Sequence, residues 1–208
     1  MKSLITLGFL SIAMTFCGLT DKLNSLKGGT NTSSNSSSSS KSSSSSIEKP
    51  QMTAAQQAIA DGATETKWDE QGLSWKLPAG WKKTEVKKQT FNYSGPDNAF
   101  FGVNISEMSS DFPMDSSRQA ELDQALEQIK SGHYSKARML EIDGIPGVEF
   151  MEGPPEEKDG IRRYQWIGYR NYLGQNEMVN VMLSTSKANF DKHSDDFPAI
   201  MYSMKSTK

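Results

Sequence analysis

A single cysteine, Cys17, is the feature that most limits how this 208-residue chain can fold. With no second thiol, the chain forms no internal disulfide, so any folded part must be held together by its own apolar core. Cys17 also precedes the sequence that can form such a core, at the junction between an apolar segment and a serine-rich one. Thiolate zinc sites and a cysteine nucleophile are therefore excluded from the residues that follow it.

The apolar segment has the composition of a secretory signal. Lys2 supplies a positive charge, and residues 4–16 form an apolar run of about the length of a signal-peptide core. A helix that spans a bilayer needs about 20 apolar residues, so this run is short for a membrane span. An uncleaved hydrophobic anchor with a spare thiol is the alternative that the same residues leave open.

The charged start, the short apolar run and the lone cysteine at its end resemble the signal peptide of bacterial lipoproteins. The resemblance implies that residues 1–16 are removed and that Cys17 becomes the first residue, carrying several acyl chains such as palmitate. Phe16 makes the lipobox a relaxed one, because Gly, Ala or Ser usually precedes the cysteine. By the same resemblance, Gly18 in place of aspartate favours the outer membrane of a bacterial cell envelope.

Residues 17–50 are predicted to form a disordered tether. They contain the serine runs 36–40 and 42–46, which bury almost no apolar surface and so cannot offset the entropy of ordering. As a flexible coil this segment has an r.m.s. reach of about 30 Å. Residues 51–208 then form a single globular domain, of a length that supports a proper core.

The predicted domain is mildly acidic. Residues 51–208 contain 18 Lys and Arg against 23 Asp and Glu. This balance argues against binding nucleic acid, which normally needs a basic patch. It argues equally against a domain that lies flat on anionic lipid, so contact with the membrane is expected through the lipid on Cys17.

Hydrophobic periodicity predicts a mixture of helices and strands within this domain. Strands joined by hairpins, with helices gathered to cover the sheet, indicate the α+β class. We expect an antiparallel sheet of about six or seven strands. The predicted elements are a helix over 53–60, strands over 73–77, 84–93 and 99–107, a helix capped by Ser116, a hairpin around Asp143 and Gly144, a strand pair over 161–173 and 177–185, and a last helix after Ser186 that Pro198 kinks or delays.

Two segments resemble PsbP-like domains. Residues 72–81 (GLSWKLPAGW) match the strand that runs into Pro-x-Gly-Trp at the start of those domains, and residues 143–150 (DGIPGVEF) match a later hairpin. The resemblance implies an α/β/α sandwich. It also implies an accessory or partner-binding role rather than a catalytic one.

No pattern in the sequence predicts a catalytic residue, a metal site or a cofactor. His133 and His193 are the two histidines, and neither lies in a motif with ligand spacing. The carboxylate pairs at 156–157 and 195–196 are typical of solvated side chains rather than of acid–base groups.

One predicted strand contains the candidate partner-binding residues Arg162, Tyr164, Trp166 and Arg170. Exposed aromatic side chains next to arginine are common at interfaces, so one face of this strand is a candidate for stacking a sugar or a partner peptide. The alternative is that the aromatic side chains fill a core surface, where strands favour them.

These features together predict a lipid-anchored protein of the cell envelope, with a binding or assembly role and no catalysis. Its expected partners are the membrane, through the lipid, and an unidentified protein or glycan. Two alternatives remain open at this point. One is an envelope enzyme whose carboxylates are assembled only in three dimensions, and the other is a surface-exposed protein that contacts a host or matrix partner.

Overall fold

The computed structural model describes residues 47–157 and 159–207. Cys17, the predicted signal peptide and residues 17–46 of the predicted tether lie outside the described residues. Within the described ranges, no helix is long and apolar enough to cross a bilayer.

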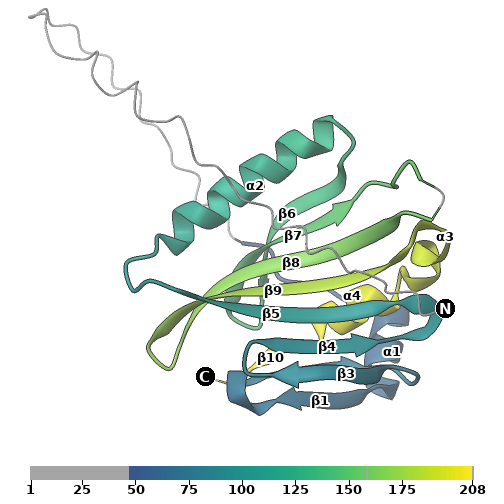
Figure 1. Ribbon diagram of the computed structural model, residues 1–208, viewed down its shortest axis with the longest axis horizontal. Coiled ribbons are helices and arrows are strands. Elements are labelled where there is room, and N and C mark those ends of the chain that lie inside the picture. The colour runs from purple at the N-terminus through teal and green to yellow at the C-terminus, as the bar shows by residue number, and fades with distance from the viewer. Residues whose placement is uncertain (1–46, 158, 208) are drawn as a thin grey trace, which may run out of the picture. The chain divides into compact units, whose positions relative to one another are not determined.

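A large antiparallel sheet, a small sheet and four helices make up the described chain (Figure 1). The helices are α1 (Ala54–Gly62), α2 (Met114–Lys130), α3 (Lys187–Phe190) and α4 (Asp196–Tyr202). The large sheet has the strand order β3 (Lys82–Lys87), β4 (Thr90–Ser94), β5 (Phe100–Met108), β9 (Gln175–Ser186), β8 (Ile161–Tyr172), β7 (Ile145–Glu152) and β6 (Tyr134–Ile142). The small sheet has the order β1 (Thr64–Trp68), β2 (Leu73–Leu77) and β10 (Lys205–Ser206).

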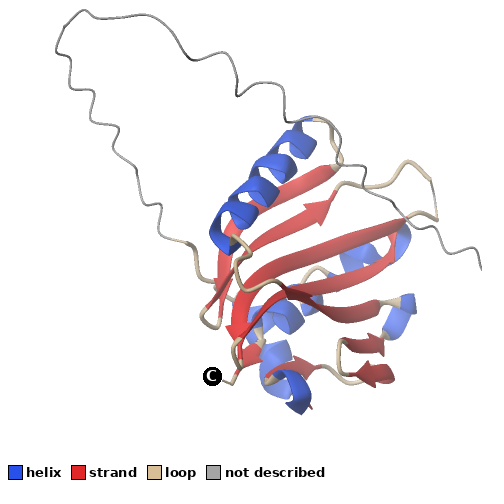
Figure 2. Ribbon diagram, turned by 60° about the vertical axis from the view of Figure 1, so that its left-hand side comes forward, coloured by secondary structure: helices blue, strands red, loops and turns tan. Residues whose placement is uncertain are grey.

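The large sheet separates two layers, as Figures 1 and 2 show from two sides. Helix α2 packs on one face, over β6, β7 and β8. The small sheet and the helices α1, α3 and α4 lie on the other face. The predicted α+β class, an antiparallel sheet covered by helices, is confirmed.

The main core fills the layer between the two sheets. Trp75 of β2 packs against Phe91 of β4 and Phe101 of β5, with ring centroids 5.2 and 5.5 Å away. Alternate residues of β5, Phe101, Val103 and Ile105, all point into this layer and are buried. This is the alternation that the sequence predicts for a half-buried strand.

Local signals in the sequence correctly identify the start of one helix and one turn. In the capping box of α1, Gln56 N donates to the Thr53 hydroxyl at 3.2 Å, and Thr53 N donates to the Gln56 side chain at 3.1 Å. Asp143 and Gly144 both have positive φ, 49° and 84°, as the type I′ turn of the β6–β7 hairpin requires.

Other element boundaries differ from the prediction. Residues 84–93 form two strands, β3 and β4, joined by a turn at Lys88 and Gln89 that contains no Gly, Pro, Asn or Asp signal. Helix α2 begins at Met114 rather than after Ser116. The predicted last helix is divided, and Pro198 lies in the first turn of α4, where a missing N–H costs no hydrogen bond.

Candidate functional site

Residues 47–52, which we call the strap, run along the outer edge of β6. The main-chain oxygen of Glu48 accepts a hydrogen bond from Glu141 N at 2.8 Å, in a parallel bridge with Leu140. Arg138 Nη1 lies 2.7 Å from the Glu48 carboxylate, and Lys49 lies 3.3 Å from that of Glu141. Residues 47–50 end the predicted tether, so this part of it is attached to the sheet.

A buried carboxylate lies beneath the strap. Glu149 of β7 has a side chain that is 0% exposed. Its Oε2 accepts hydrogen bonds from Arg138 Nε at 2.5 Å and from Lys136 Nζ at 2.8 Å. Its Oε1 accepts from the hydroxyls of Tyr164 and Tyr202, which lie 2.9 Å apart. We call these five residues the Glu149 cluster.

The cluster keeps Glu149 ionised. Burial raises the pKa of its carboxyl, but hydrogen bonds from Arg138, Lys136, Tyr164 and Tyr202 outweigh burial and bring the pKa below its ordinary value. Burial and the charge of Glu149 raise the pKa of Tyr202 to about 12 and that of Tyr164 well above its ordinary value. At neutral pH the carboxylate is therefore charged and the two tyrosines are neutral, so none of these three groups titrates where a general acid or base works.

A groove of about 360 Å³ begins at Tyr202 of the cluster. Its walls come from the strap, α1, β1, β2, α4 and β10, and they include Met52, Gln57, Glu65, Lys76, Ser203 and Lys205. The Ser203 hydroxyl joins two of these walls, because it accepts from Lys76 N at 2.9 Å and donates to Ile200 O at 2.7 Å. The groove therefore combines fixed hydroxyls with two amines and one carboxylate.

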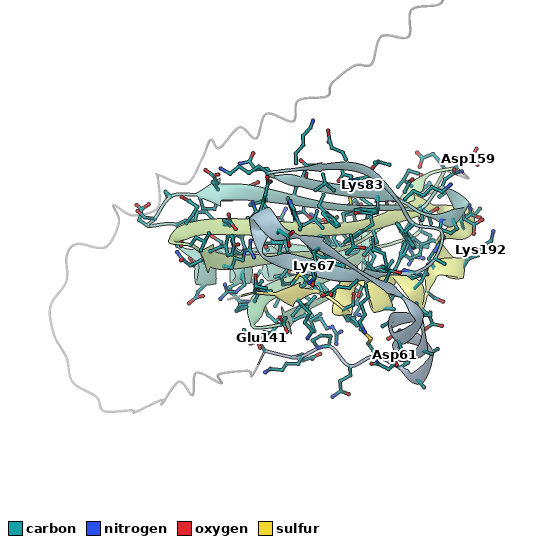
Figure 3. All side chains as sticks on the ribbon, turned by 90° about the horizontal axis from the view of Figure 1, so that it is seen from below. Asp61, Lys67, Lys83, Glu141, Asp159 and Lys192 are labelled. Carbon is teal, nitrogen blue, oxygen red and sulfur yellow. The ribbon has the colours of Figure 1, made fainter. Side chains whose placement is uncertain are left out.

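The amines of the groove are only loosely held. Lys76 Nζ lies 4.0 Å from the Asp61 carboxylate, and both side chains are exposed (Figure 3 labels Asp61). Lys205 Nζ lies 3.0 Å from Asp143 and is also exposed. Exposed pairs of this kind are worth about 0–1 kcal/mol, so a ligand can exchange them at little cost. A second hollow of about 490 Å³ is lined by the strap and Arg138.

The structure places three of the four candidate partner-binding residues inside the domain. Tyr164 and Trp166 are 1% and 0% exposed and belong to the main core. Arg170 is also buried, and its guanidinium donates to Glu177 and Gln71. The arrangement is the alternative one, in which the aromatic side chains fill a core surface, so a partner has no access to stack on them.

Arg162 is the most accessible of the four. Its guanidinium lies over the Phe190 ring, 4.3 Å from the centroid, and its Nε donates to Glu152 O at 2.9 Å. These contacts hold the β7 and β8 ends and α3 together. The four residues therefore share one strand face but form no common surface.

Each histidine lies near one member of a carboxylate pair, but no larger group forms among the described residues. His193 is buried, stacks on Phe197 and bonds to Asp196 at 2.8 Å. A hollow of about 420 Å³ is lined by His133, Glu152 and Glu156, but the Glu152 carboxylate is already held by Arg163 at 2.9 Å. Among residues 47–157 and 159–207, no three His, Cys, Asp or Glu side chains gather as ligands for a metal.

Sequence reasoning did not identify the Glu149 cluster. One signal was present, because Glu149 is an acidic residue between Val148 and Phe150, within the otherwise apolar run of residues 145–151. An acidic side chain in such a strand is almost never fully buried without a partner. Its partners come from β6, β8 and α4, and no local pattern indicates that these segments meet.

No protein-family model matches the chain, and neither does any curated protein. Several solved structures do match the chain. LpqN of Mycobacterium tuberculosis, which is described as involved in cell envelope biogenesis, aligns with a TM-score of 0.50 at 11% identity. The alignment covers 70% of this chain and 86% of LpqN.

Two further structures match less closely. The cyanobacterial PsbP of Synechocystis aligns with a TM-score of 0.45 at 14% identity, over 70% of this chain and 94% of that protein. A Bacteroides thetaiotaomicron protein aligns with a TM-score of 0.47 at 15% identity, over 71% of this chain but only 49% of its own length. This chain thus spans about half of the Bacteroides protein. At these identities the likeness to LpqN is one of fold alone, and that fold is the α+β arrangement of an antiparallel sheet covered by helices.

Proposed function

We propose that this chain is a lipid-anchored accessory protein of the bacterial cell envelope, which binds a partner and catalyses no reaction. The observation that carries the proposal is the state of Glu149. Four donors occupy this buried carboxylate, so it stabilises the wall of a groove rather than taking part in proton transfer. What the groove offers a ligand is binding groups, the amines of Lys76 and Lys205.

The N-terminal sequence supports the anchor and the compartment. Cys17 follows a signal-like apolar run, and Gly18 favours the outer membrane. The serine-rich segment between Cys17 and the strap is long enough to hold the domain about 30 Å from the lipid. LpqN, which shares the fold, is described as involved in cell envelope biogenesis, and we extend that compartment to this chain as part of the proposal.

The anchor is tested by mass spectrometry and fractionation of the full chain expressed in a bacterium. We expect the membrane-extracted protein to begin at an acylated Cys17, and Cys17→Ser to move to the soluble fraction. An unmodified cysteine, or a Cys17→Ser protein that stays with the membranes, would contradict the anchor. Neither result tests binding through the groove, so binding is measured separately.

Binding through the groove is tested with Lys76→Glu, which reverses a charge on its wall. The matched control is Lys83→Glu on β3, which Figure 3 shows far from Asp61. We expect the wild-type chain and the control to retain the same protein from a bacterial envelope extract, and Lys76→Glu to lose it. Equal retention by all three chains would show that the groove is not the binding site.

A further inference from the structure

The face of the large sheet that α2 covers only in part has an unusual composition. Helix α2 packs on β6, β7 and β8, and Figure 1 shows β5 and β9 beyond it. Strand pairing sets two neighbouring rows of side chains on this face. One row contains Asn92, Gly102, Met182 and Gln165, and the other contains Thr90, Asn104, Asn180 and Ile167. We call these eight residues the amide face.

None of the eight residues is charged, although charged residues make up 23% of the chain. At the margins, Arg163 is paired with Glu152 and Lys87 with Glu85. The eight residues themselves therefore carry no charge that would attract a strongly acidic or basic polymer. A partner that matches it is itself uncharged.

The amide groups of this face are largely free to bind. Gln165 Nε2 donates to Asn180 Oδ1 at 3.5 Å, a long contact. Asn104 is exposed, whereas Asn92 Oδ1 is buried and lies out of reach of a ligand. A side-chain amide both donates and accepts, which suits the hydroxyl groups of a ligand.

An aromatic ring lies across the same face. A Cβ at Gly102 would come within 2.5 Å of Phe100 Cε1, so the missing side chain makes room for the Phe100 ring to lie over the strand. Phe100 is partly exposed. The ring and the nearby Met182 provide a flat apolar surface beside the amides, onto which the C–H side of a sugar ring packs.

We infer that the amide face binds a neutral, hydroxyl-rich glycan chain. A peptide strand cannot add here, because β4, β5, β9 and β8 already pair with each other and leave no free main-chain edge. The face measures about 14 Å from β4 to β8, so it suits an extended chain of sugars. The site lies on the opposite side of the large sheet from the groove, and the inference does not depend on the proposed function of that groove.

The test uses the purified full chain in a zwitterionic detergent, because a glycoside detergent would compete for the site. The probes are chitohexaose, cellohexaose and laminarin, with polygalacturonate as the anionic comparison, and binding is measured by isothermal titration calorimetry. We expect saturable binding of at least one neutral probe and none of polygalacturonate. We also expect Phe100→Ala and Asn104→Ala each to weaken that binding about tenfold, which corresponds to about 1.4 kcal/mol.

The controls separate this site from the groove and from misfolding. Lys76→Glu should bind the glycan as the wild type does, and Asn104→Ala, at an exposed position, should keep the wild-type unfolding midpoint. The inference is overturned if no neutral probe binds, if polygalacturonate binds equally well, or if both variants bind unchanged. It is also overturned if the two variants abolish capture of a protein partner while no glycan binds.

Discussion

Glu149 is buried among apolar neighbours and yet stays charged. An isolated carboxylate in such a place would cost several kcal/mol in lost hydration. Arg138 and Lys136 supply opposite charge, and two tyrosine hydroxyls occupy the other oxygen. The result is a fully satisfied polar cluster that fixes the position of Tyr202, and therefore one wall of the groove.

Replacing this carboxylate is expected to destabilise the domain. Glu149→Gln leaves Arg138 and Lys136 without their shared anion, and we expect a loss of about 2–4 kcal/mol at pH 7. This expected loss lies toward the lower end of the range for breaking buried ion pairs, because both cations are partly exposed. Urea unfolding measures it, with the exposed Glu107→Gln as control. A loss below about 1 kcal/mol would contradict the account.

The same carboxylate makes stability depend on pH. Its pKa in the folded chain lies below the ordinary value of 4.5. Its contribution is therefore complete above that value and is lost as the pH falls through the folded-state pKa. We expect the free energy of unfolding of the wild type to fall below about pH 4.5, and Glu149→Gln to fall less steeply. Parallel curves for the two proteins would contradict this.

Leu173 has an unfavourable backbone conformation for a leucine at the tip of the β8–β9 hairpin. It has φ of +50° and a side chain that is 88% exposed, at a turn position that favours Asn, Asp or Gly. We expect Leu173→Asn to stabilise the domain by about 0.5–1 kcal/mol in urea unfolding. Leu126→Asn, on the exposed side of α2, is the control and should be slightly destabilising.

At the scale of elements, the ends of helices depend on single side chains. Thr53 forms both halves of the capping box that starts α1, and α1 forms one wall of the groove. Helix α4 starts late because Pro198 is tolerated only in a first turn. These two helices pack together on the same side of the large sheet.

The capping box is expected to contribute measurably to stability. Thr53→Ala removes a hydroxyl acceptor from Gln56 N, and we expect a loss of about 1 kcal/mol. Thr84→Ala, an exposed residue of β3, is the matched control and should change stability by no more than about 0.5 kcal/mol. If the two variants unfold at the same urea concentration, the box does not support α1.

At the scale of the described domain, one core joins both sheets. It contains Trp68 and Trp75 from the small sheet and Phe101 and Val181 from the large one. Both sheets contribute side chains to this core, so they should unfold together. The absence of a second cysteine in the chain means that no disulfide contributes.

The whole domain is therefore expected to unfold in a single cooperative transition. Far-ultraviolet circular dichroism and tryptophan fluorescence should give the same urea midpoint, because Trp68, Trp75 and Trp166 lie in the shared core. Addition of dithiothreitol should leave that midpoint unchanged. Two separate transitions, or a shift on reduction, would contradict the single core.

Much of the fold could be predicted because its signals are local. The alternation of Phe101, Val103 and Ile105, the Thr53 capping box and the Asp143-Gly144 turn each act within a few residues. Strands β1 and β10 were missed, since Thr64–Trp68 shows little alternation and Lys205–Ser206 is a strand only because β2 pairs with it. The last helix was predicted to follow Ser186, but its division into α3 and α4 was not predicted.

The sequence by itself determined the class of fold and the single-cysteine chemistry, because composition and periodicity act along the chain. Only the tertiary structure decided which polar groups meet. Glu149, Tyr164 and Tyr202 come from three separate segments: the pairing of β7 with β8 brings the first two together, and α4 brings Tyr202 to them. It also decided which face of β8 is buried, since the packing of the small sheet covers Tyr164 and Trp166 and leaves Gln165 and Ile167 on the amide face. Alternation can tell two faces of a strand apart, but it cannot tell what will cover each of them.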